Sequence, residues 1–296
     1  SKLRFLNSES GVEQWQHKLP AGVIGRMHWG SDTELMYGFS WALSPGEVSH
    51  INTTSQEQLK WVETDMIGLE SERFSLPYRT EWRSADGIKF DAWVYRPGRI
   101  NNDIFVPAKP IRPFPVVILF HGGPESQFRP RFMGRYNYLI AEEKIVIICP
   151  NVRGSRGYGK KFLKADNGRE REKVLLDIER IYNVICADPS LDQKRIAVVG
   201  GSYGGFMTLH SMVKMNNFLK CGVDVVGISN FVTFLENTSE YRRDLRRAEY
   251  GDERLPEMRK FLQELSPLSN VGEIACPLLI VQGANDPRVP ASESEQ

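Results

Sequence analysis

The chain of 296 residues lacks both a strong excess of one charge and a long apolar run. Its 38 basic and 37 acidic residues leave a formal net charge of +1. Proteins that bind nucleic acid or anionic membranes usually carry basic patches, so this balance gives no reason to expect either partner. No apolar stretch approaches the roughly 18 residues that a membrane-spanning helix needs. We therefore expect neither nucleic acid nor a membrane as a partner.

Cysteine is scarce as well. The four cysteines are Cys149, Cys186, Cys221 and Cys276, and their spacing is not that of metal ligands. We expect them to be free thiols, which favours a reducing compartment and hence a cytoplasmic location. No metal and no cofactor is expected.

Two patterns of apolar residues divide the chain near residue 75. Residues 1–75 hold short strand-like segments separated by Gly, Asp, Ser and Pro, which is typical of antiparallel β-structure. About 40 to 50 residues make one propeller blade, so we interpret this segment as the remnant of a β-propeller domain. Residues 76–296 alternate continuously apolar strands with helices. That alternation predicts an α/β domain with a mostly parallel sheet and helices on both faces.

The charged residues 240–265 are predicted to be helical. Their arginine-rich run 242–247 is interpreted as a solvated helix face rather than a phosphate site.

Ser202 lies at the centre of the most informative motif. An apolar strand over 196–199 leads into Gly200-Gly201-Ser202-Tyr203-Gly204, and a helix is expected to follow from Phe206. Strand, sharp glycine turn and helix form the context of a nucleophile elbow, which exposes a serine hydroxyl beside a helix N-terminus. The alternative is a glycine-rich turn with an incidental serine. The flanking strand and helix favour the elbow.

Two further loops follow apolar strands and carry residues that such a serine needs. The segment His121-Gly-Gly-Pro124 comes directly after the strand 116–120, where a backbone N–H can bind an oxyanion. Asp286 comes after the last apolar strand and can orient a base. Either loop can also be a plain turn with no contact to a substrate.

The base itself is missing. The chain has five histidines, and none follows Asp286. His210 stands eight residues after Ser202 on the same helix, about 12 Å along its axis, which is too far from the hydroxyl. His121 is expected to serve its own loop. The chain is therefore expected to be a piece of a longer protein, cut at both ends, with the histidine beyond residue 296.

Four motifs together resemble the prolyl oligopeptidase family of serine peptidases, most of all its acylaminoacyl-peptidase and dipeptidyl-peptidase-like members. They are His121-Gly-Gly-Pro124, Asn151-Val-Arg-Gly-Ser155, Gly200-Gly-Ser-Tyr-Gly-Gly205 and Asn285-Asp-Pro-Arg-Val-Pro290. The resemblance implies an α/β-hydrolase domain combined with a β-propeller, and a short peptide as substrate. One departure is Val152, where the family more often has tyrosine.

The resemblance also implies roles for individual residues. Ser202 would be the nucleophile, Asp286 the acid of the triad, and the N–H groups of Gly123 and Tyr203 the oxyanion donors. The pocket for the residue before the scissile bond would be lined by Phe231, Phe234 and Val289. Both phenylalanines are equally compatible with a place in the core.

Three functions remain open at this point. A serine peptidase acting through an acyl-enzyme is favoured, because a propeller over the site would admit only small or unfolded peptides. A carboxylesterase could use the same elbow, and a binding protein that had lost its base could keep the fold. A homo-oligomer is compatible with the family.

Overall fold

The computed structural model describes residues 1–101 and 104–296. The chain divides into two compact units. The first comprises Ser1–Tyr78, Tyr95–Lys109 and Arg129–Lys144, and the second comprises Arg79–Val94, Pro110–Phe128 and Ile145–Gln296. The division into domains 1–75 and 76–296 stays a prediction.

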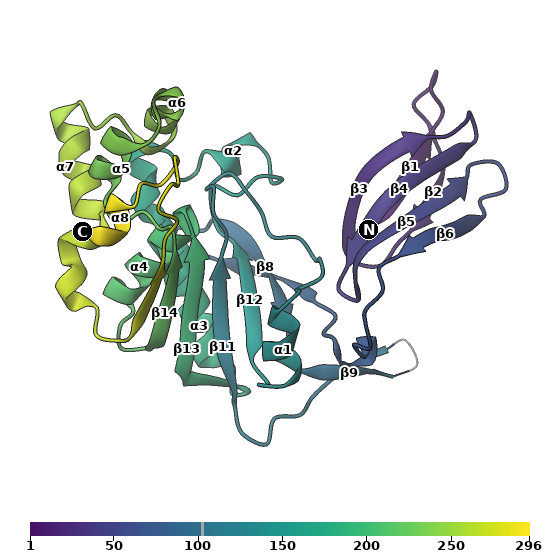
Figure 1. Cartoon of the computed structure of the whole chain (residues 1–296), viewed down its shortest axis with the longest axis horizontal. Coiled ribbons are helices and arrows are strands. Elements are labelled where there is room, and N and C mark those ends of the chain that lie inside the picture. Colours follow the sequence, from purple (N-terminus) through teal and green to yellow (C-terminus); the bar gives the residue numbers. More distant parts are fainter. Residues whose placement is uncertain (102–103) are drawn as a thin grey trace. The chain divides into compact units, whose positions relative to one another are not determined.

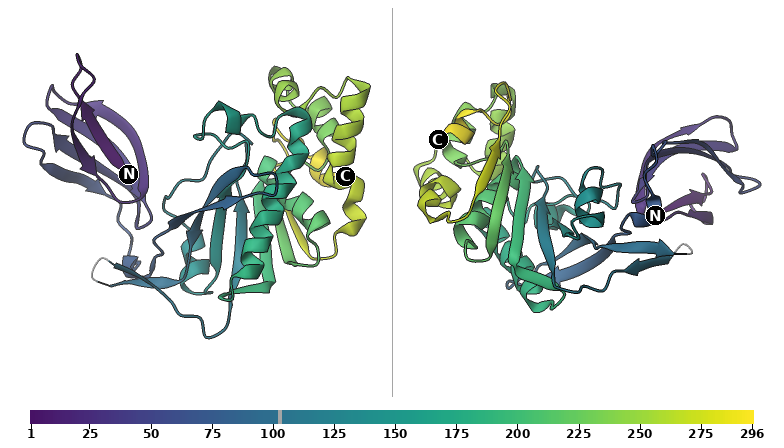
Figure 2. Two further views of the ribbon diagram at one scale, coloured as in Figure 1. Left: turned by 180° about the vertical axis from the view of Figure 1, so that it is seen from behind. Right: turned by 60° about the horizontal axis from the view of Figure 1, so that its bottom comes forward.

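Antiparallel strands dominate the first unit, and no helix occurs in residues 1–63 (Figure 2). Leu35, Tyr37 and Phe39 alternate with half-exposed residues along one strand, and the two-residue period puts all three on its buried face. The elements are β1 (Lys2–Leu6) paired with β2 (Glu13–Lys18); β3 (Gly22–Trp29), β4 (Glu34–Trp41), β5 (Ser44–Asn52) and β6 (Gln58–Glu63) in one sheet; η1 (Ser71–Arg73); β9 (Gly98–Asn101) paired with β10 (Ile104–Pro107); and α1 (Tyr136–Ala141).

A seven-stranded sheet forms the centre of the second unit. Its strand order is β15-β14-β13-β11-β12-β8-β7, and the pairs from β12 through β11, β13 and β14 to β15 are parallel. Val116 lies opposite Val146 on one side and Ile196 on the other. The strands are β7 (Tyr78–Arg83), β8 (Lys89–Tyr95), β11 (Phe114–Phe120), β12 (Val146–Asn151), β13 (Leu191–Gly201), β14 (Leu219–Val225) and β15 (Leu278–Val281).

Helices connect these strands, and α5 to α8 gather beside β14 (Figure 1). Residues of β11 and β12 are buried in succession, as expected where both faces of a parallel sheet are covered. The predicted α/β class, preceded by antiparallel strands, is confirmed. The helices are α2 (Lys160–Leu163), η2 (Gly168–Lys173), α3 (Val174–Ala187), α4 (Tyr203–Lys214), α5 (Phe231–Asn237), α6 (Glu240–Tyr250), α7 (Pro256–Leu265), η3 (Pro267–Glu273) and α8 (Ser292–Glu295).

The segment 240–265 is helical, as predicted, but it is divided into two helices. The segment forms α6 and α7, and α6 ends at Gly251, whose φ of 113° lies outside the range open to other residues. Pro256 then opens α7 at its first turn, where the missing N–H costs nothing.

Among residues 1–101 and 104–296, no helix combines the length and apolar character that crossing a bilayer requires. In the same residues, no three or more His, Cys, Asp or Glu side chains are grouped so that they could hold a metal ion.

Candidate active site

Ser202 stands between β13 and α4 in a strained backbone conformation, with φ 58° and ψ −118°. Its flanking glycines allow the chain to turn this sharply. A Cβ on Gly200 would lie 2.1 Å from the carbonyl oxygen of Gly204, and one on Gly204 would lie 2.4 Å from that of Phe120. Only glycine fits at such distances. The turn therefore holds Ser202 at the carboxyl end of the central strands, half-buried, in the geometry of a nucleophile elbow.

The glycine loop after β11 packs directly against this elbow. A Cβ on Gly122 would come within 2.9 Å of the Gly201 carbonyl oxygen and 3.4 Å of the Ser202 Cβ. Gly122, Gly123 and Ser202 line one cavity of about 200 Å³. The carbonyl oxygen of Gly123 accepts a hydrogen bond of 3.3 Å from Arg246. The loop is thus fixed from the α6 side, and its backbone lies beside the serine.

Tyr203 is the first residue of α4, and the first N–H groups of a helix have no partner within it. Its side chain is fully buried, and its hydroxyl donates to Asp166 at 3.1 Å. Arg171 pairs with Asp166 at 2.9 Å, and its guanidinium lies 5.0 Å from the Tyr203 ring and 4.2 Å from the Tyr250 ring. Burial raises the pKa of Asp166, although the Arg171 charge and the Tyr203 hydroxyl act in the opposite direction. This buried group fixes the residue that follows the serine.

Sequence reasoning missed the part that Asp166 and Arg171 play. Both lie outside the glycine motifs, in the segment between β12 and α3, and their separation of five residues matches no catalytic pattern. Their full burial, which is rare for charged residues, is visible only in the structure.

Asp286 lies in the loop after β15. Its carboxylate accepts N–H bonds from Arg288 at 2.8 Å and Val289 at 3.2 Å. Partial burial raises its pKa, but these two hydrogen bonds and the Arg288 charge outweigh it, so the pKa of Asp286 is lowered and the group is ionised at neutral pH. Arg288 and Val289 line the cavity that contains Ser202. The loop therefore reaches the cavity, while within the described residues Asp286 and Ser202 are not hydrogen-bonded to each other.

Two histidines belong to the second unit, and neither is placed as a base. His121 points its ring nitrogens at the Gly122 carbonyl oxygen (2.8 Å) and the Ser155 hydroxyl (2.9 Å), as expected for a residue that serves its own loop. His210 is buried on α4 beside Phe206. Burial lowers the pKa of each to about 4. Among the residues that the structure describes, no histidine side chain hydrogen-bonds to Ser202 or Asp286.

Two of the three residues expected to line a pocket border the Ser202 cavity, and the third does not. Phe234 and Val289 line the cavity of Ser202. Phe231 is fully buried, with its ring 4.7 Å from that of Phe206 and 5.2 Å from that of Tyr250. It is not among the residues that line this cavity.

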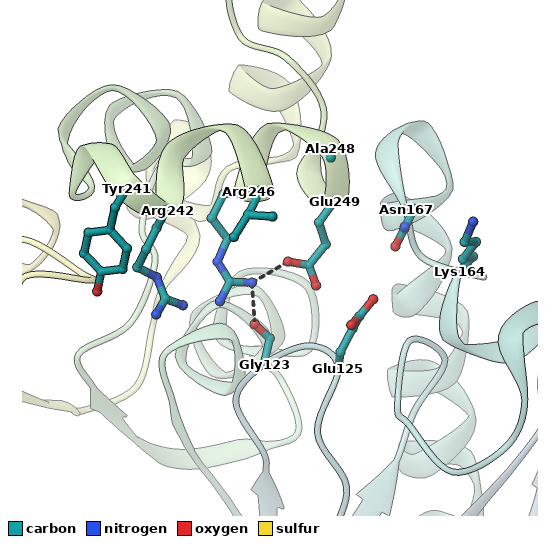
Figure 3. A pocket seen from close by; sticks show the side chains of 10 residues that line it. Gly123, Glu125, Lys164, Asn167, Tyr241, Arg242, Arg246, Ala248 and Glu249 are labelled. Atoms are coloured by element: carbon teal, nitrogen blue, oxygen red, sulfur yellow. Dashed lines mark hydrogen bonds and ion pairs between the residues drawn. The ribbon is translucent and has the colours of Figure 1, made fainter.

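The arginine run of α6 is not a uniformly solvated face. Arg242 and Arg246 are half-buried and line the cavity with Ser202, together with Arg288 from the Asp286 loop. Figure 3 shows both side chains projecting from α6 toward Gly123. Sequence reasoning missed them, because charge alone does not tell which side of a helix faces a site.

The sequence matches a known family model and curated relatives. Residues 130–296 match the model of the prolyl oligopeptidase family. The chain is 38% identical over 199 residues to dipeptidyl aminopeptidase BIII of Pseudoxanthomonas mexicana. The matched residues cover 66% of this chain and 28% of that protein. The chain thus spans under a third of the length of this curated relative.

Solved structures agree on the fold. A puromycin-hydrolyzing peptidase of Mycobacterium tuberculosis superposes with a TM-score of 0.85 at 24% identity, covering 99% of this chain and 44% of that one. The acylaminoacyl peptidase of Pyrococcus horikoshii does so with a TM-score of 0.76 at 24% identity, covering 94% and 42%. With the family model matching more than half of the residues, the chain belongs to the prolyl oligopeptidase family and carries its α/β-hydrolase fold.

Proposed function

We propose that the whole protein is a serine-type peptidase that hydrolyses short peptides through an acyl-enzyme on Ser202. One observation carries the proposal: a serine held at φ 58° borders a cavity that it shares with Gly123 and Val289. Membership of a peptidase family supports the peptide bond as the target. Relatives named as a dipeptidyl aminopeptidase and an acylaminoacyl peptidase support short substrates.

In this mechanism the Ser202 hydroxyl oxygen attacks the carbonyl carbon of the scissile bond and gives its proton to a base. The N–H groups of Gly123 and Tyr203 stabilise the resulting oxyanion, since one lies in the loop beside the serine and the other begins α4. The amine leaves with the proton. Water then attacks the ester, which releases the acid and restores Ser202. The ionised Asp286 orients the base and stabilises its cationic form.

The base in this proposal is a histidine outside the 296 residues. His121 is hydrogen-bonded to Gly122 and Ser155, and His210 is buried on α4 with no hydrogen bond to Ser202 or Asp286 among the described residues. A pKa of about 4 leaves either ring a poor proton acceptor at neutral pH. The whole protein is therefore the form to assay.

The test compares the whole protein with its Ser202→Ala variant on a panel of aminoacyl arylamides. We expect a loss of about a millionfold in kcat, as for nucleophile removal in a comparable triad. Ser211→Ala, in the same helix but away from the cavity lining, should keep turnover within about threefold. Turnover that survives Ser202→Ala would refute the proposal.

Two other outcomes identify the alternatives. Rapid hydrolysis of short acyl esters without hydrolysis of any arylamide would indicate a carboxylesterase. Peptide binding without turnover of either substrate class would indicate a binding protein. The cytoplasmic location and a homo-oligomeric state stay predictions.

A further inference from the structure

The lining of the Ser202 cavity is unusually rich in positive charge. Three of its side chains are arginines, Arg242, Arg246 and Arg288, and none of its described lining residues carries a carboxylate. A cavity of about 200 Å³ with three guanidinium groups attracts anions, because low-dielectric walls strengthen the field of the charges.

The three arginines differ in how well their charges are compensated. Arg246 pairs with Glu249 and donates to the Gly123 carbonyl oxygen at 3.3 Å. Arg288 lies 3.7 Å from Asp286. Arg242 has neither an ion pair nor a side-chain hydrogen bond with any residue that the structure describes, although it is half-buried. In Figure 3, dashed lines start from Arg246 and none starts from Arg242.

Other arginines of the run do have partners for their side chains. Arg243 donates to the Thr238 carbonyl oxygen at 3.1 Å, and Arg247 holds Glu253. Arg242 and Arg246 are one helical turn apart, so their charges repel each other. A half-buried guanidinium without a partner and with a like charge beside it is costly, and a carboxylate from outside would satisfy it through two parallel hydrogen bonds.

We propose that Arg242 binds a carboxylate of the peptide substrate, with Arg246 adding positive potential, so that the preferred peptides are anionic next to the scissile bond. The proposal rests on the peptidase function proposed above. Because one small cavity holds both Ser202 and Arg242, the carboxylate belongs within roughly one or two residues of the attacked carbonyl. It is either the free C-terminal carboxylate of the leaving group or the side chain of Asp or Glu.

Two substrate pairs separate these sources in the whole protein. The first pair is a short peptide with a free C-terminal acid and the same peptide as an amide. The second pair is amidated and carries Glu or Gln next to the scissile bond. We expect the native protein to favour the acid member of one pair, and that pair identifies which carboxylate Arg242 receives.

Arg242→Gln should lower kcat/KM for the favoured acid about ten- to hundredfold and leave its neutral partner within about threefold. Arg242→Lys should keep part of the preference, because it retains the charge but not the fork of donors. Lys164→Gln is the matched control: it removes one positive charge from the neighbouring cavity, which Arg242 also lines, but not from the cavity of Ser202. Its preference should equal that of the native protein.

Binding distinguishes failure of this proposal from failure of the proposed function. The same pairs are titrated calorimetrically into Ser202→Ala, with and without Arg242→Gln. A carboxylate preference that Arg242→Gln abolishes supports the site even when the native protein hydrolyses no peptide. The proposal is overturned by equal affinity for acid and neutral members, by a preference that survives Arg242→Gln, or by an equal loss for both members.

Discussion

At the scale of single residues, glycines give the site its tightest constraint. A Cβ on Gly200 would lie 2.1 Å from the Gly204 carbonyl oxygen, and a backbone atom cannot move aside without distorting the elbow. We expect Gly200→Ala to lower the free energy of unfolding by about 3 kcal/mol. Gly272→Ala is the control, because no atom lies within 4 Å of its Cβ position, and it should change stability by less than about 0.5 kcal/mol. Urea denaturation measures both, and equal effects would contradict the geometry.

Asp224 on β14 makes stability depend on pH. It is buried, and burial raises its pKa from 3.8 to about 6, although a hydrogen bond from the Gly227 backbone acts the other way. The native state therefore holds this proton to a higher pH than the unfolded chain does. Between about pH 4 and 6 the native state binds more protons, so its stability falls as the pH rises through this window.

The Asp224→Asn variant isolates that contribution. Since one pKa unit corresponds to about 1.4 kcal/mol, the native protein should lose on the order of 2–3 kcal/mol relative to the variant between pH 4 and pH 6.5. Chemical denaturation at several pH values measures the difference. Parallel stability curves for the two proteins would show that Asp224 does not titrate in this range.

At the scale of elements, the buried ion pair between Asp166 and Arg171 of η2 contacts the start of α4 through the hydroxyl and ring of Tyr203. Removing its cation by Arg171→Met leaves Asp166 buried without an opposite charge, and among the described residues the Tyr203 hydroxyl remains as its side-chain partner. We expect a loss of about 3–5 kcal/mol in the free energy of unfolding. The double variant Asp166→Leu/Arg171→Met should recover much of this loss, because no lone charge remains. Thermal or urea unfolding of the three proteins measures the effect, and a double variant less stable than the single one would contradict it.

The types of the secondary-structure elements were largely predictable from the sequence. The ends of the helices, and which side chains face the cavity, were not. The apolar runs 116–120 and 196–199 lie in neighbouring parallel strands, as continuously apolar runs between helices predict for a sheet covered on both faces. The break between α6 and α7 at Gly251 was not predicted. Phe231 and Phe234 looked alike in the sequence, and three residues apart on α5 they share a face on which both rings contact Tyr250. Even so, of the two only Phe234 lines the cavity, a difference that the sequence pattern does not carry.

At the scale of the whole molecule, the second unit has a much larger hydrophobic core than the four-stranded sheet of the first. The second unit has one large core through β11, β13 and α4. The core of the first contains Leu3, Leu35, Tyr37, Phe39 and Ile51. On β6, the side chains of Leu59 and Trp61 remain more than half exposed. Hydrophobic burial is the main stabilising term, so the first unit should open at lower cost.

Amide hydrogen exchange tests this difference. We expect the central amides of β11 and β13 to exchange only through global unfolding, and those of β4 and β5 at least about a hundredfold faster. Exchange measured by mass spectrometry after proteolysis resolves these strands. Equal protection in the two sheets would show that the small core is supported by more than its own apolar contacts.

At position 202, the backbone conformation favours glycine for stability, whereas activity requires serine. Serine at φ 58° and ψ −118° pays a strain of about 1–3 kcal/mol, whereas glycine adopts such angles freely. The added flexibility of a glycine in the unfolded chain offsets only part of this strain. In a library randomised at position 202 and selected for folding alone, glycine should therefore displace serine over successive rounds. Adding a requirement for turnover should bring serine back, so the two sets of survivors, compared by sequencing, record how far the chain departs from its own conformational preference to present one hydroxyl group.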